Sequence, residues 1–396
     1  MPSAVTRYIT KELLGWFSLW LVLLTLLVII ILVGQEAVRT NLGLGPILRL
    51  LPFVLPTSLA YAVPGTILFT VCLVYGRMSA DNEVLATKAL GISPLALLWP
   101  AYILAFVLSL VGVWLNDLSY SWGQLGVQRV VIQSIEEIVY GMLRTQKSYA
   151  NQRFSIVVKD VQGRKLIKPF ITFQAGRDMP VVTISAEEAE LQTNLSRNTM
   201  TLILDRFELK VGDTAHGYIP TREAREYPLE FLSARDSRQG NPANLPISQI
   251  AGETAAQVRL IEELEQSLAA EAALALVTGE FGELRDATWK ARRSQLTAAR
   301  GRLYRLQTEP WRRWAAGFSS LAFVLVGAPL AILLRKSDVM TIFGGAFVPI
   351  LIGYYPLFAG CIDRVKAGAL PPCTVWTANL LLAAVGVWLL RRVIRY

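Results

Sequence analysis

The stretch LLGWFSLWLVLLTLLVIIILV, residues 13–33, contains 21 residues without a charged side chain. As an α-helix it spans about 30 Å, which matches the hydrocarbon thickness of a bilayer. It is longer than the apolar part of a signal peptide, and it ends in VGQEAVR instead of a small-residue cleavage site. We therefore predict that this first segment is a transmembrane helix that stays in the protein.

The composition of the whole chain agrees with a membrane protein. Of its 396 residues 53% are hydrophobic and 17% are charged, against about a quarter charged in an ordinary soluble domain. Five further apolar runs follow, at about 50–75, 94–115, 314–334, 340–362 and 373–390. The sequence thus predicts a polytopic α-helical membrane protein with six transmembrane helices, three on each side of a long insertion.

The distribution of basic residues predicts the orientation. With the N-terminus in the cytoplasm, nine basic residues flank the spans on the inside, namely Arg7, Lys11, Arg77, Lys88, Arg335, Lys336, Arg391, Arg392 and Arg395. The short outside loops then hold four, namely Arg39, Arg49, Arg364 and Lys366. Because positive charge accumulates on the cytoplasmic side, this excess predicts that both termini are cytoplasmic.

The insertion between the third and fourth spans is therefore expected outside the cytoplasm, and its first part has a strand pattern. After a helical lead-in, short alternating runs follow with Gly and Asn turns: FSIVVKDVQGRKL, FITFQ, VVTISAEEAEL and MTLILDRFELKVG. This pattern is typical of a small antiparallel sandwich or roll. We assign residues 1–115 to the first three spans and 116–247 to this domain.

The second part of the insertion, residues 248–310, changes to a helical period. Apolar residues spaced three and four apart occur on two arms, with a turn near 278–282, which predicts a helical hairpin before the last three spans in 311–396. The second arm is basic. Its charges are either a solvated face or an attraction to anionic lipid head groups.

Several chemistries lack their residues. His216 is the only histidine, so no Ser-His-Asp triad or histidine-rich metal site can form, and we predict no catalytic or metal-binding residues. No GxxxxGK[ST] motif is present, so the chain is expected to bind no ATP itself. The three cysteines encode no disulfide framework, and no aromatic-interleaved basic module indicates nucleic acid.

A short polar stretch between the second and third spans, GRMSADNEVLATKALGIS at 76–93, predicts a helix over 79–91. Ser79 is a suitable N-cap, Asp81 and Glu83 oppose the positive helix end, and Gly91 can terminate the helix before Ser93 starts the next one. The helix is either a plain amphipathic connector or a rigid knob that a cytoplasmic partner grips through Glu83.

This stretch and the arrangement of the spans resemble the lipopolysaccharide-export permease family, LptF/LptG (the YjgP/YjgQ type). The matching residues are Ser79, Asp81, Glu83, Ala89, Gly91 and Ser93. The segments RYITKELLGWF, WRRWAAGFSSLAFVLVGAPLAI and LPPCTVWTANLLL also resemble family segments. The hairpin departs from the short connection expected between the β domain and the fourth span in this family.

The resemblance implies a subunit of an ABC-type transporter in the bacterial inner membrane, with a jelly-roll-like periplasmic β domain. Its implied partners are a cytoplasmic ABC ATPase dimer that binds the ATP, a second homologous permease, periplasmic β bridge proteins, and lipopolysaccharide or a related glycolipid as cargo. The helix 79–91 is implied to couple to the ATPase. The residues for this role are Ser79, Asp81, Glu83 and Gly91.

For lipid contact the resemblance points to cationic residues near the outer membrane surface. Arg39 lies near the outer end of the first span, and Arg312 and Arg313 precede the fourth. An alternative reading is a non-transporting sensor or scaffold with an envelope-facing β domain. A third, an intramembrane enzyme, is disfavoured because the spans hold few ionisable residues.

Overall fold

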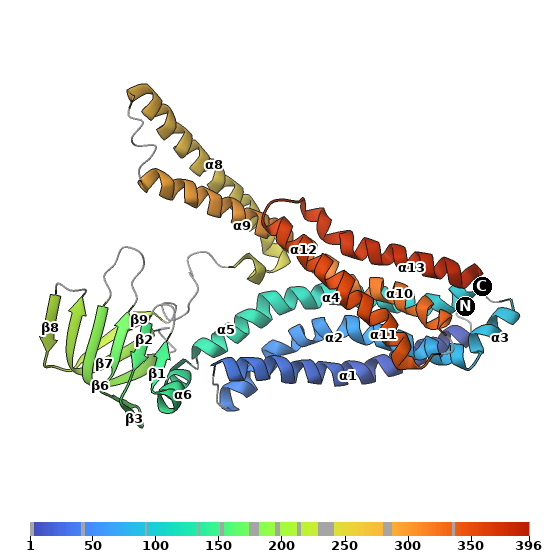
Figure 1. Ribbon diagram of the computed structural model, residues 1–396, viewed down its shortest axis with the longest axis horizontal. Helices are drawn as coiled ribbons and strands as arrows, with labels where there is room; N and C mark the ends of the chain where they lie inside the picture. The colour runs from blue at the N-terminus through green and yellow to red at the C-terminus, as the bar shows by residue number, and fades with distance from the viewer. Residues whose placement is uncertain are drawn as a thin grey trace. The chain divides into compact units, whose positions relative to one another are not determined.

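The computed structural model describes residues 4–40, 44–91, 93–133, 135–150, 154–173, 182–194, 199–211, 215–228, 241–279, 287–334 and 337–395. Within these ranges six helices are long and apolar enough to cross a membrane, which confirms the predicted set of three and three (Figure 1). The helices of the first half are α1 (Ala4–Thr40), α2 (Leu44–Ala80), α3 (Glu83–Ala89), α4 (Pro94–Leu118), α5 (Gln124–Gln133) and α6 (Ile135–Gln146), with the π-helical turn η1 (Ser119–Gly123) joining α4 to α5.

The second half contains the predicted hairpin and the last three spans. Its elements are η2 (Pro242–Asn244), α8 (Ile247–Thr278), α9 (Ala287–Gly317), α10 (Ser319–Leu333), α11 (Val339–Pro349), η4 (Ile350–Tyr354), α12 (Tyr355–Lys366), η5 (Pro372–Trp376) and α13 (Thr377–Arg395). The fifth span is α11, η4 and α12 together. Its middle turn is π-helical and directly follows Pro349, where the missing N–H interrupts the regular ladder.

The chain forms two compact units. One combines residues 1–28, 55–123 and 241–396, and the other combines 29–54 with 124–240. The end of α1 and the start of α2 thus belong to the same unit as the strands, and they pack on α5 through a small apolar cluster around Val33, Leu50, Val54 and Val130. This division crosses the segment boundaries that the sequence suggested, because a long helix can contribute its two ends to different cores.

The membrane unit is held together by apolar packing and by close helix contacts at glycines. Its core joins α1, α2, α4, α10, α11 and α13 through buried side chains such as Leu13, Ile67, Leu98 and Val324. Small residues let membrane helices approach closely where water-driven collapse does not act. A Cβ at Gly112 would lie 3.3 Å from the Cα of Gly317, so α4 and α9 touch backbone to backbone.

The β unit contains the predicted antiparallel sheet. Its nine described strands all pair antiparallel: β1 (Ser148–Ala150), β2 (Phe154–Val157), β3 (Asp160–Gln162), β4 (Lys165–Ile167), β5 (Phe170–Phe173), β6 (Val182–Asn194), β7 (Thr199–Val211), β8 (Ala215–Ile219) and β9 (Glu223–Pro228). The two long strands β6 and β7 each pair with two shorter strands in succession, β5 then β4 along β6 and β9 then β8 along β7.

A local break in the pairing of β6 with β7 changes which residues face the core. Buried positions alternate along β6 at Ile184 and Ala186, and then resume one residue later at Ala189 and Leu191. The break falls at Glu187, which forms an ion pair of 2.7 Å with Arg206, a residue of β7 with φ of +46°. The β6–β7 ladder skips Glu187 and Arg206 and continues in the same register on both sides of them, so the buried face shifts at this point.

The helical hairpin is cross-linked by ion pairs between its arms. Arg300 of α9 contacts Glu265 of α8 at 2.8 Å, and Arg302 contacts Glu253 at 3.6 Å. A third pair joins Arg292 and Glu271. The two arms lie side by side in Figure 1 and bury Ile261, Leu268, Ala299 and Leu306 between polar outer faces. Half of the basic arm is therefore neutralised within the hairpin.

We predict that Gly317→Ala lowers the stability of the folded protein by about 1–3 kcal/mol, because the new Cβ would lie 2.6 Å from the backbone nitrogen of Val113. The matched control is Gly301→Ala on the same helix, where no atom lies within 4 Å. That change should leave stability unchanged or raise it by about 0.5–1 kcal/mol. Thermal unfolding of both variants in mild detergent checks the pair, and equal effects would contradict the close α4–α9 contact.

Candidate functional site

The short helix α3 lies between α2 and α4, at the end of the membrane unit that holds both chain termini (Figure 1). It is bounded by two residues in the left-handed region. Asn82, just before it, has φ of +60°, and Gly91, just after it, has φ of +79°. Asparagine and glycine tolerate this conformation best, so the sequence itself sets where α3 begins and ends.

The prediction that Ser79 caps this helix is wrong. α2 continues to Ala80, and α3 begins only after Asn82, which makes no side-chain capping bond. Ser79 is buried, and its hydroxyl donates to the carbonyl of Ile332 on α10 at 3.1 Å. The end of α2 is packed against α10, so the Ser79 hydroxyl bonds to a carbonyl of α10 and does not cap the first turn of α3.

Glu83 and Gly91 lie as the helix pattern suggested, whereas Asp81 does not fall in the first turn of the helix. Glu83 occupies the first turn of α3 and is half-buried, whereas Asp81 precedes the helix and is exposed. Gly91 follows the last turn, and its N–H donates to the carbonyl of Lys88 at 2.9 Å. Leu85 and Leu90 are 54% and 78% exposed, so α3 presents apolar as well as acidic groups.

α3 is fixed to the bundle on its other face. Val84 is buried in the main core, and the Lys88 ammonium donates to the carbonyl of Val393 near the end of α13 at 3.1 Å. A cavity of about 310 Å³ lies between these contacts, lined by Ser79, Asn82, Val84, Leu85, Lys88, Ile332, Leu333 and Val393. A displacement of α3 would therefore act directly on α2, α10 and α13.

Two further polar contacts lie near this end of the bundle. Arg77 at the end of α2 forms an ion pair of 2.9 Å with Glu12 of α1. Asp338 caps α11 by accepting from the Thr341 hydroxyl at 2.6 Å and from the Thr341 N–H at 3.2 Å. These hydrogen bonds favour the charged carboxylate and hold the pKa of Asp338 below its usual value.

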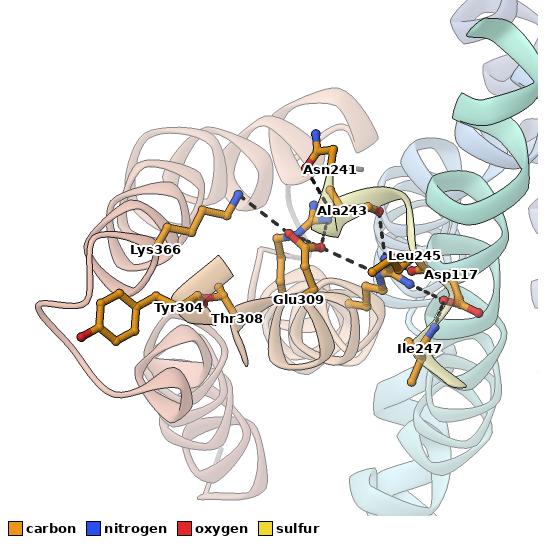
Figure 2. Close-up of polar contacts among 11 residues, drawn as sticks. Asp117, Asn241, Ala243, Leu245, Ile247, Tyr304, Thr308, Glu309 and Lys366 are labelled. Atoms are coloured by element: carbon orange, nitrogen blue, oxygen red, sulfur yellow. Dashed lines mark hydrogen bonds and ion pairs between the residues drawn. The ribbon is translucent and has the colours of Figure 1, made fainter. Parts of the chain in front are cut away.

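A second polar site, the Arg313 cluster, lies where the hairpin meets the membrane helices (Figure 2). We define it as Asp117, Glu309, Arg312, Arg313 and Lys366. Arg313 is fully buried, pairs with Asp117 at the end of α4, and donates to the carbonyls of Ala243 and Leu245 at 2.9 and 2.7 Å. Asp117 also accepts from the N–H of Ile247 at 2.9 Å, which fixes the start of α8.

Glu309 is the central carboxylate of this cluster. Its side chain is 2% exposed, and it accepts from Arg312 at 3.1 Å. It lies 3.9 Å from Arg313 and 4.0 Å from Lys366 of α12. The Arg312 guanidinium also stacks over the Tyr120 ring at 4.2 Å from its centre. Each buried charge thus has an opposite charge beside it, as a low-dielectric site requires.

This geometry bears on the residues expected to touch lipid. In this conformation Arg313 cannot reach a lipid, because its side chain is fully buried and its ends are bound within the protein. Arg312 is largely buried against Glu309 and Tyr120. Arg39 falls in α1, but its side chain lies outside the described residues. Among the described residues no group of three or more His, Cys, Asp or Glu is placed to hold a metal.

The comparison with family models decides the identity. The model described as "Lipopolysaccharide export system permease LptF/LptG" matches residues 7–392, which is nearly the whole chain. The chain belongs to the LptF/LptG family of lipopolysaccharide export permeases. The search of curated proteins gave no match to the chain. With six apolar helices of spanning length, this LptF/LptG protein is a multi-pass membrane protein and a permease.

Sequence reasoning missed two features of this LptF/LptG chain. Asp117 was not recognised as the partner of Arg313. A local signal did exist for the other partner, because Glu309 stands four residues before Arg313 and this spacing places both side chains on one helix face. The contact of Lys88 with Val393 was also missed, because Lys88 was counted as a flanking charge. Asp117 lies far from Arg313 in the chain, and Lys88 lies far from Val393, so no local pattern links either pair.

We predict that Asn82→Val destabilises the α2–α3 connection by about 1–2 kcal/mol, because a β-branched residue is strained at positive φ. Asn82→Gly is the matched control and should be tolerated, since glycine adopts this conformation readily. Amide hydrogen exchange of residues 79–91 measures the difference. Equal protection in the two variants would show that the left-handed residue does not define α3.

We predict that Arg313→Met destabilises the protein by about 3–5 kcal/mol, because Asp117 and Glu309 lose a buried partner. Adding Asp117→Leu should recover part of the loss by removing the uncompensated carboxylate. The control is Arg293→Met, at an exposed position on the same helix. The unfolding midpoints of the three variants in detergent test this, and a loss no larger than that of Arg293→Met would exclude a structural role for the cluster.

Proposed function

We propose that this chain is the permease subunit of an ABC-type transporter that extracts lipopolysaccharide, or a related glycolipid, from the bacterial inner membrane and passes it to a periplasmic bridge. The observation that carries the proposal is α3, a short helix with fixed ends, an acidic first turn and an exposed apolar surface. It stands at the end of the bundle where the basic flanks predict the cytoplasm. The family membership supports transport as the general activity.

In this proposal α3 is the coupling helix that fits into a groove of a separate ATPase. Glu83 provides a carboxylate for a charge-assisted hydrogen bond to a basic side chain of the ATPase, and Asp81 adds negative charge beside it. Gly91 and Asn82 keep the helix short and rigid. Ser79 acts within the chain, because it transmits movement of α3 to α10 through the Ile332 carbonyl.

The ATP would be bound and hydrolysed by that partner, and this chain would need no cofactor of its own. A dimer of the ATPase has two coupling positions, so a second permease of the same family completes the transporter. The first and fifth spans are the least buried of the six described spans: 17% and 22% of the residues in their most apolar windows are buried. Such exposure suits helices that meet the second permease and the lipid between them.

The lipid route then begins at the outer leaflet and leads to the β unit. We place both termini in the cytoplasm and the β unit in the periplasm, where its antiparallel strands offer edges for periplasmic bridge proteins of similar fold. Arg39 remains our candidate for contact with lipid phosphate near the outer end of α1. No nucleic acid takes part.

The second candidate function is a non-transporting sensor or scaffold. The hairpin of α8 and α9 favours it, because this pair of arms exceeds the short connection expected in the family. A sensor needs no ATPase and depends on its envelope-facing parts. Deletion of residues 250–308 would then abolish all function, whereas a change in α3 would leave function intact.

The decisive experiment reverses the charge at Glu83. We expect Glu83→Lys to abolish copurification of a Walker-motif ATPase and ATP-dependent release of lipopolysaccharide, because a repulsive charge replaces the charge-assisted bond. The protein should remain folded, since the Glu83 side chain forms no ion pair with any other described residue and α3 is fixed by other residues.

The matched control is Glu262→Lys, the same charge reversal at an exposed position of the hairpin. It should retain both ATPase binding and release. Normal export by Glu83→Lys would refute the coupling role. Purification of the wild-type chain without any ATPase would favour the sensor.

A further inference from the structure

A polar cavity of about 460 Å³ lies beside the Arg313 cluster, between α9, α12 and the segment that precedes α8. It is lined by Asn241, Ala243, Arg305, Glu309, Asp363, Lys366 and Ala367. All of these residues belong to the membrane unit. Figure 2 shows Lys366 approaching Glu309, and Asn241 hydrogen-bonded to Ala243 in a different segment.

The cavity walls are held by local backbone geometry. After α12 the chain closes with hydrogen bonds from Ala367 to Asp363 and from Gly368 to Val365, at 3.0 and 2.9 Å. Gly368 has φ of +76° and lies against the Tyr304 ring, where no Cβ would fit. On the opposite wall, Asn241 accepts from the N–H of Ala243 at 3.2 Å. These contacts fix the position of Lys366 against α9.

The charges that line the cavity are not all used within the protein. Glu309 is already bound by Arg312, and Lys366 approaches it only to 4.0 Å. Arg305 is exposed, and among the described residues its side chain takes part in no ion pair or hydrogen bond. Two cationic groups therefore face the cavity with donors to spare, and Asp363 and Asn241 provide oxygen acceptors.

The position of the cavity relative to the membrane surface places it at the level of lipid head groups. Trp311 and Trp314 on α9 are both more than 40% exposed, and the Trp376 ring lies tilted against Phe318, with 5.6 Å between the ring centres. Exposed tryptophans gather at the membrane–water interface. Arg305 precedes Trp311 by six residues, or about 9 Å along the helix, which is the level of the polar head groups.

We propose that this cavity binds a phosphorylated sugar, with phosphate held by Arg305 and Lys366 and sugar hydroxyls held by Asp363 and Asn241. Its position beside the tryptophans points to the head group of a lipid. Arginine and lysine are the usual partners of phosphate, and carboxylate and amide oxygens accept hydroxyl protons. The inference rests on the proposed function, and it makes the hairpin root a cargo contact that the short family connection would lack.

The test measures binding to the full chain in nanodiscs of phosphatidylcholine. The probes are a bisphosphorylated glucosamine-disaccharide lipid, the same lipid after removal of its phosphates, and water-soluble glucosamine 6-phosphate. We expect the double variant Arg305→Gln and Lys366→Gln to lose on the order of tenfold or more affinity for the phosphorylated lipid. Its affinity for the dephosphorylated lipid should not change.

The matched control is Lys290→Gln with Arg293→Gln, which removes two exposed charges from the same arm far from the cavity. It should bind as the wild type does. Asp363→Asn should keep or increase affinity for phosphate. If the double variant does not fold, Arg305→Gln alone carries the test, since that side chain is exposed and forms no ion pair or hydrogen bond with any other described residue.

Equal losses in the cavity variant and the control, or no loss in the cavity variant, would overturn the proposal. Equal binding of glucosamine 6-phosphate and the lipid would support the site but assign it to a free sugar phosphate. Retained lipid binding in a chain that recruits no ATPase would refute the proposed transporter and leave this site standing.

Discussion

The fully buried guanidinium of Arg313 is the constraint on which the arrangement of the membrane unit depends. A charge removed from water costs several kcal/mol unless opposite charges and hydrogen bonds surround it. Here those partners come from three segments: Asp117 from α4, the carbonyls of Ala243 and Leu245 from the chain before α8, and Glu309 from α9 itself. The root of the hairpin must therefore lie against the ends of α4 and α9 for the charge to be satisfied.

How far the sequence predicted the structure depended on the range of the interactions involved. Six spans, an antiparallel β domain and a helical hairpin follow from hydropathy and periodicity, which are properties of contiguous residues. The bonds of Ser79 to Ile332 and of Arg313 to Asp117 join residues 253 and 196 positions apart. A serine before a charged helix fits an N-cap locally, and only the packing of α10 against α2 assigns its hydroxyl elsewhere.

The same reasoning separates two kinds of information in α3. The ends of α3 are determined by the local sequence, because Asn82 and Gly91 adopt positive φ with little strain. The attachment of α3 to the bundle is determined by residues far away in the chain, because Lys88 binds the last turn of α13 and Val84 packs in the core. A lysine near the carbonyl end of a helix is favoured by the helix dipole, so this contact stabilises α13 as well as α3. A helix with local ends and distant anchors can transmit force without changing its own shape.

The ion pairs of the hairpin finally explain why a basic arm need not be a lipid-binding surface along its whole length. Arg292, Arg300 and Arg302 are each matched by a glutamate of α8 in antiparallel register. Exposed pairs of this kind add little stability, but they cancel charge and set the alignment of the arms. Among the described residues, no glutamate is paired with Lys290 or Arg293 towards the turn, or with Arg305 at the root. Of these three residues, Arg305 alone lies near the exposed tryptophans of α9, which mark the membrane–water interface. Arg305 is therefore the one of the three that can contact a lipid head group.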